Sequence, residues 1–111
     1  MEIIVSGKDC VITPLTPVLN KCECEKLLET VKEYAFFNIG INLCFVEDCT
    51  NDFIEYIAEK KNISIFNIPS DIFAIFNMMK IDKTVNLFTS EIDFKTNRNR
   101  LTKPNLKLVQ V

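Results

Sequence analysis

Residues 43–58, LCFVEDCTNDFIEYIA, run from an apolar segment through a polar turn into an amphipathic pattern. This order predicts a strand over residues 41–46 that is buried on both faces, then a helix over about residues 51–60. Side chains between such elements cap the helix, and its first N–H groups face outward. We therefore expect the turn to respond to phosphoryl groups or to contact a partner protein. Its polar residues are Asp48, Thr50, Asn51 and Asp52.

The N-terminal region has the pattern of a β-hairpin. Residues 2–6 and 10–13 are short and rich in β-branched side chains, and Gly7, Lys8 and Asp9 between them favour a turn. Two prolines at positions 14 and 17 then end the extended segment, since proline cannot donate to a β-ladder.

An amphipathic helix follows the hairpin. Its cap is either Thr16, with Pro17 in the first turn, or Asn20, with Glu23 three residues later. Residues 38–40 contain a glycine and are expected to end this helix. The apolar positions that repeat at helical spacing are Cys24, Leu27, Leu28, Val31, Tyr34 and Ala35.

The second half of the chain continues the alternation of strands and helices. We expect strands over 63–68 and 84–88, a helix that ends near Lys80, and a short helix over 91–94. The expected caps are Ser70 and Ser90, and the expected inner stripe of the third helix is Ile72, Ile75, Phe76 and Met79. Residues 106–111 alternate in the manner of an edge strand.

The order β-β-α-β-α-β-α-β-α predicts an α/β fold. We expect a mostly parallel mixed sheet of about five strands with about four helices packed on it. At 111 residues the chain is long enough for one core. We therefore expect a single domain over residues 1–94 and a basic C-terminal tail over residues 95–111. The turn at 47–52 lies at the carboxyl end of a strand, where α/β proteins bind their ligands.

The composition favours a binding protein over an enzyme. The chain has no histidine and no glycine-rich phosphate loop, so no pair of nucleophile and base can be built from the spacing. The five cysteines are expected to be reduced thiols that act as small hydrophobic residues. Cys22 and Cys24 are two positions apart on a helix and diverge, so we expect no metal site and no cofactor.

Charge and hydropathy restrict the partners. The tail holds five basic residues and no acid, whereas the rest of the chain is strongly acidic, and we expect no nucleic-acid binding. No apolar segment approaches the length of a membrane span, and residues 1–7 lack the basic start of a signal peptide. A cytoplasmic protein is expected.

Two stretches resemble the STAS family, the small domain of anti-sigma factor antagonists and sulfate transporters. Residues 46–57 fit, without a gap, a turn of the type Val-x-x-(Ile)-Asp-Ser-Ser-Gly followed by Leu-x-x-Leu. Residues 67–82, NIPSDIFAIFNMMKID, are similar to the strand-to-helix passage of that family, and residues 84–92 to its last strand and closing helix. The resemblance covers about residues 2–94.

The resemblance implies a bacterial regulator of transcription that works by protein binding. In the antagonists of this family, a partner anti-sigma kinase phosphorylates a serine of the turn, and the phosphate blocks the complex. Asp52 occupies the position of that serine here, Thr50 that of the family's aspartate and Asn51 that of its first serine. Phe53 occupies the position of the family's glycine, and we expect its ring to contact the partner together with the polar residues of the turn. A carboxylate at residue 52 imitates a phosphate weakly, and Thr50 is the remaining candidate phosphoacceptor.

Three other functions stay open at this level. The chain is alternatively a STAS-like accessory subunit of an ABC-type transport complex, docked on the ATPase subunit through the same turn. An enzyme is the weakest alternative. The helix of residues 72–79 is also a candidate site for an apolar ligand, and Phe73 and Met78, off its inner stripe, are expected to form a dimer or partner surface.

Overall fold

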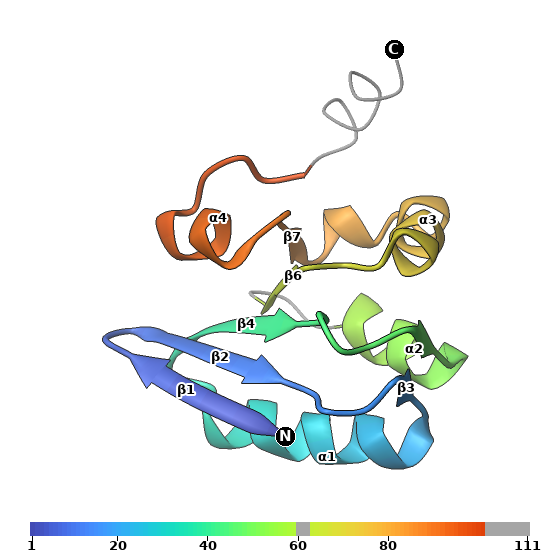
Figure 1. Cartoon of the computed structure of the whole chain (residues 1–111), viewed down its shortest axis with the longest axis horizontal. Helices are drawn as coiled ribbons and strands as arrows, with labels where there is room; N and C mark the ends of the chain where they lie inside the picture. Colours follow the sequence, from blue (N-terminus) through green and yellow to red (C-terminus); the bar gives the residue numbers. More distant parts are fainter. Residues whose placement is uncertain (60–62, 102–111) are drawn as a thin grey trace.

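The computed structural model describes residues 1–59 and 63–101 and has an α/β fold (Figure 1). Its main sheet has five strands in the order β1-β2-β4-β6-β7. The first two are antiparallel, and each later neighbour is parallel. The strands are β1 (Glu2–Ser6), β2 (Asp9–Thr13), β4 (Asn38–Asn42), β6 (Ile63–Phe66) and β7 (Asn86–Leu87). The fold class expected from the element order is confirmed.

The described residues also form four α-helices and one short 3-10 helix. The helices are α1 (Lys21–Glu33), α2 (Asn51–Ala58), α3 (Ser70–Met78), η1 (Ile81–Lys83) and α4 (Glu91–Thr96). A second, two-stranded parallel sheet pairs β3 (Val18–Leu19) with β5 (Asp48–Cys49). The sequence reading contained neither of these two strands.

The hairpin of β1 and β2 forms as expected. Ser6 pairs with Asp9 across the loop of Gly7 and Lys8, and the register continues without a bulge to Glu2 opposite Thr13. Gly7 has a φ of 61°, the left-handed region that the first loop residue of a type II′ turn requires. The glycine therefore sets both the turn and the register.

Local capping fixes where two of the helices begin. The Asn20 side chain accepts a hydrogen bond from the Glu23 N–H at 3.0 Å, so Asn20, and not Thr16, caps α1. The Ser90 hydroxyl accepts from the Asp93 N–H at 3.3 Å and caps α4, as predicted. Ser70 does not cap α3, because the helix already begins at this residue and Pro69 is its N-cap.

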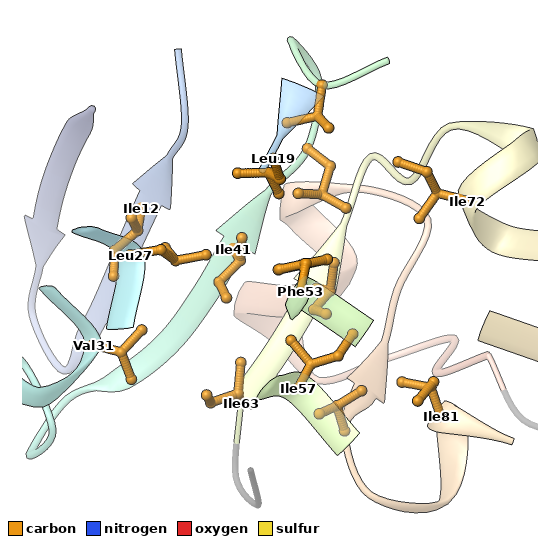
Figure 2. Packing of buried hydrophobic residues seen from close by; sticks show 14 of the residues in the cluster. Ile12, Leu19, Leu27, Val31, Ile41, Phe53, Ile57, Ile63, Ile72 and Ile81 are labelled. Atoms are coloured by element: carbon orange, nitrogen blue, oxygen red, sulfur yellow. The ribbon is translucent and has the colours of Figure 1, made fainter. Parts of the chain in front are cut away.

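The core has two parts, one on each face of the main sheet. The larger cluster joins alternate residues of β2, β4 and β6 to the inner faces of α1, α2 and α3, and Figure 2 shows Phe53 and Ile57 of α2 together with Ile41 of β4. The smaller cluster is Val11, Phe66, Phe88 and Phe94, on the face covered by α4. Phe94 stacks on Phe66 with a centroid distance of 5.5 Å.

The third helix is less buried than its pattern suggested. Ile72 and Phe76 are fully buried, but Ile75 is 36% and Met79 59% exposed, so the expected four-residue stripe is wrong. Only a narrow face of α3 contacts the core. Ile75 and Met79 lie beside this face and are therefore exposed.

The chain beyond α4 continues to pair with the sheet. Helix α4 ends at Thr96, two residues later than predicted, and the N–H of Leu101 donates to the Leu87 carbonyl at 2.7 Å. The edge strand predicted over residues 106–111 lies outside the described residues.

Candidate functional site

The polar turn is built differently from the sequence expectation. The predicted strand over 41–46 is wrong: β4 spans Asn38–Asn42 and includes residues 38–40, which we expected to end the preceding helix. The Asn42 side chain explains the early end, because its Oδ1 accepts from the Cys44 N–H at 3.1 Å and from the Asn67 amide at 2.9 Å. An asparagine that bonds its own backbone two residues later turns the chain.

The predicted turn contains the short strand β5 (Asp48–Cys49), and backbone hydrogen bonds hold the residues on both sides of it. The N–H groups of Glu47 and Asp48 both donate to the Pro17 carbonyl, at 2.7 and 3.1 Å, and the Thr50 N–H donates to the Leu19 carbonyl at 3.0 Å. Backbone hydrogen bonds to Pro17 and Leu19 therefore fix the position of the predicted turn.

The hydroxyl of Thr50 lies within hydrogen-bond distance of two acceptor groups of the protein. Its Oγ1 lies 3.3 Å from the Leu19 carbonyl and 3.3 Å from Asp52 Oδ2, and the side chain is half-buried. Thr50 is the N-cap residue of α2, yet its side chain makes no capping bond. A phosphoryl group on Thr50 would therefore replace the contact with Leu19 and lie beside the carboxylate of Asp52.

The other polar residues of the site are on the surface. Asp52 is exposed in the first turn of α2, where a negative charge interacts favourably with the helix dipole. Asn51 is exposed as well. Asp48 is exposed, and its carboxylate accepts from the Cys49 N–H at 2.8 Å. The structure thus brings Asp48, Thr50, Asn51 and Asp52 together on one edge of the molecule.

Phe53 does not belong to this surface. It is completely buried, and its ring lies 6.3 Å from that of Phe76, centroid to centroid, within the larger core cluster (Figure 2). The expectation that Phe53 contacts a partner is therefore wrong. The helical pattern alone already favoured this result, because Phe53, Ile54 and Ile57 share one face of α2.

An apolar hollow that the sequence reading missed lies beside the polar turn. It has a volume of about 270 Å³ and is lined by Leu15, Thr16, Pro17 and Phe45. Leu15 and Phe45 are each 58% exposed, and both line this hollow, so they form a small apolar patch. Phe45 was expected inside a buried strand, and its exposure follows from the turn at Asn42. The signal available in the sequence was the pair of prolines, which keeps residues 14–17 out of the sheet.

The hollow and the turn are one continuous surface. Pro17 lines the hollow and also accepts the two N–H groups that begin β5. Glu47, Asp48 and Asp52 are all exposed, and the sequence has no basic residue between positions 33 and 59. The surface therefore combines apolar side chains with negative charge.

Burial suppresses the acidity of the thiols near the site. Desolvation, followed by the negative charge of Asp48, raises the pKa of Cys49 to about 11. Desolvation also raises the pKa of Cys24, with smaller contributions from Asp52 and Glu25. Burial raises the pKa of Tyr56 to about 12. These groups are therefore neutral at pH 7 and do not act as nucleophiles.

The raised pKa values predict a loss of stability at alkaline pH. The native state holds these protons more tightly than the unfolded chain, so the unfolded state is favoured as the pH rises above about 9. We expect the urea midpoint to be flat from pH 7 to 8 and to fall between pH 9 and 11. The Cys49→Ser variant should show a smaller fall, whereas Cys22→Ser, at an exposed site, should match the wild type. An unchanged midpoint up to pH 11 would contradict the burial of these groups.

Two further surface features lie at the two ends of α3. A hollow of about 370 Å³ at the start of α3 is lined mainly by apolar atoms of Ile68, Phe73, Phe88 and Leu101. Met78, which is 80% exposed, lies next to Met79 at the end of the same helix.

Within residues 1–59 and 63–101, no three acidic or cysteine side chains are grouped closely enough to hold a metal ion.

Comparisons with known proteins give no identification. The chain matches no protein-family model, and no curated protein matches it. No helix in the described part of the chain has both the length and the apolar character that crossing a membrane requires.

Proposed function

We propose that the protein is a STAS-like, non-enzymatic interaction module of the cytoplasm that binds a regulatory protein partner. The observation that carries the proposal is the apolar hollow of Leu15 and Phe45 directly beside the acidic turn. Aromatic side chains are enriched in the cores of protein interfaces, which polar residues surround. The fitting partner presents an apolar side chain flanked by lysine or arginine.

The fold supports the same function. The turn follows β4 at the carboxyl end of the parallel part of the sheet, where α/β proteins place their binding loops. The strands of the main sheet and the α-helices follow the predicted order that motivated the STAS resemblance, with β3 and β5 as additions. An anti-sigma factor serine kinase is therefore the first partner to test.

The proposed module carries an altered switch. Asp52 supplies a permanent negative charge at the position where the resemblance places the phosphorylated serine. The carboxylate of Asp52 also accepts a hydrogen bond from the hydroxyl of Thr50, the candidate phosphoacceptor. We propose that the carboxylate of Asp52, which has less charge and fewer acceptor oxygens than a phosphate, does not block the complex. The unmodified module then binds its partner, and any phosphate is added at Thr50.

The binding proposal is tested by titration of the purified chain against the serine-kinase anti-sigma factors of its source organism. We expect Phe45→Ala to weaken binding about tenfold or more, because it removes the anchor from the hollow. Ile92→Ala is the matched control, since Ile92 is 73% exposed on α4 and lies outside the hollow. Equal affinities of wild type and Phe45→Ala would refute the assignment of this surface.

The same mixtures, with ATP, test the altered switch. Mass spectrometry should place any phosphate on Thr50 and none on the Thr50→Val variant. A phosphate on another residue, such as Ser90, would refute the role of Thr50. Titration against a transporter ATPase subunit separates the alternative, since binding there and not to the kinases would favour an accessory transport subunit.

A further inference from the structure

We infer that two copies of this chain pair through their β1 strands, so that the two sheets join edge to edge in an antiparallel dimer. Strand β1 lies at one end of the sheet (Figure 1). It pairs with β2 on one side, and no other described residue pairs with its outer side. The inference is independent of the function proposed for the turn.

The edge is apolar and lacks the features that prevent edge pairing. All five residues of β1 are exposed, among them Ile3 at 37%, Ile4 at 52% and Val5 at 45%. Edge strands of monomeric proteins are usually protected by lysine, proline or a bulge. Residues 2–6 contain no lysine or proline, and their register with β2 has no bulge. Such a strand favours addition of another strand.

The hairpin register determines which backbone groups point outward. The pair that closes a two-residue hairpin loop, here Ser6 and Asp9, exchanges hydrogen bonds, and hydrogen-bonded pairs then alternate along the ladder. The N–H and C=O groups of Glu2, Ile4 and Ser6 therefore point towards β2. Those of Ile3 and Val5 point away from the sheet and are available to a second strand.

These outward groups are arranged symmetrically about Ile4, which is why a second copy is the fitting occupant. If the two strands run antiparallel with Ile4 opposite Ile4, Ile3 of each copy faces Val5 of the other. Both of these pairs are then hydrogen-bonded, and the two Ile4 residues form the closer, non-hydrogen-bonded pair. A two-fold axis through this point makes the contact the same for both copies.

The charge pattern of β1 is compatible with the same register. Glu2 of one copy then lies opposite Ser6 of the other, and Glu2 is the one charged residue of β1. No two like charges are therefore opposite each other over residues 2–6. The contact is small, because one strand from each copy contributes, so we expect a reversible dimer with a dissociation constant on the order of 10–100 μM.

Sedimentation equilibrium of the full chain, from a few to several hundred micromolar, tests the dimer. We expect a concentration-dependent mass that reaches that of two chains. Ile4→Lys places two like charges against each other at the axis and should raise the dissociation constant about tenfold or more. Met78→Lys adds the same charge to an exposed residue of α3 and should leave it unchanged. A monomer at all concentrations, or an equally stable dimer of Ile4→Lys, would overturn the inference.

A cross-link tests the register. In a Cys22→Ser/Cys44→Ser background, which removes the two exposed native thiols, Ile4→Cys should form an intermolecular disulfide on mild oxidation. Non-hydrogen-bonded partners have Cα atoms about 4.5 Å apart, within the range of a disulfide. Ile3→Cys, whose equivalent lies on the diagonal, should cross-link much less. Equal cross-linking of both variants would refute this register, and pairing with another protein's strand would leave both uncross-linked in the purified chain.

Discussion

Phe53→Ala is expected to lower the free energy of unfolding by about 3–5 kcal/mol, the usual cost of truncating a buried phenylalanine. Phe53 is fully buried in the larger core cluster and contacts Phe76 from α3. Its removal leaves a cavity where α2 and α3 meet the sheet. Because small domains have only about 5–15 kcal/mol of stability in total, this single change removes a large share. Urea denaturation followed by circular dichroism measures the effect.

Phe45→Ala is the matched control, because the same atoms are removed from a side chain that is 58% exposed. We expect it to change stability by about 0.5 kcal/mol or less. If Phe53→Ala prevents folding altogether, Phe53→Leu should still fold with a loss of about 1 kcal/mol. Equal stability of Phe53→Ala and Phe45→Ala would show that Phe53 is not in the core.

Gly40→Ala is expected to cost about 1–3 kcal/mol, although it adds one methyl group. A Cβ atom at residue 40 would lie 2.7 Å from Cε2 and Cζ of Phe94 and 3.0 Å from Cε1 of Phe66. These rings stack on each other between the sheet and α4, so neither is free to move away. The same denaturation experiment measures the loss.

A double mutant shows whether the clash is the cause. Phe94→Leu removes ring atoms above Gly40, so the added methyl should cost less in that background, and the two changes should combine less than additively. Gly7→Ala is the contrasting control, because nothing lies within 4 Å of its Cβ and only its positive φ opposes alanine. Additive effects of the Gly40 and Phe94 changes would contradict this packing.

Elements with local determinants could be predicted from the sequence. The Asn20–Glu23 capping pair, the Ser90 cap and the Gly7 turn each involve residues within four positions, and all three are present. The apolar repeat of α1 was correct for Cys24, Leu27 and Val31, the residues that the helix buries, but Ala35 lies beyond the end of the helix and is exposed.

Features that depend on distant contacts could not be predicted. In the sequence Gly40 resembles a helix-ending glycine, but it lies within β4, beside the ring of Phe94, a residue far along the chain. The apolar run after Ile41 resembled a strand, but the Asn42 side chain is shared with Asn67, and Phe45 therefore lies outside the core. The exposure of Asp48, Asn51 and Asp52 could be predicted, whereas the apolar hollow beside them could not.

The parallel arrangement of β2, β4, β6 and β7 has a consequence for how the chain folds. Parallel neighbours cannot be joined by a tight turn, so β2 reaches β4 only through α1, and β4 reaches β6 only through α2. The hairpin is the one pair in the main sheet that forms by a local loop. We therefore expect it to appear within microseconds and the rest of the sheet to assemble much more slowly, because each loop closure costs entropy before its contacts form.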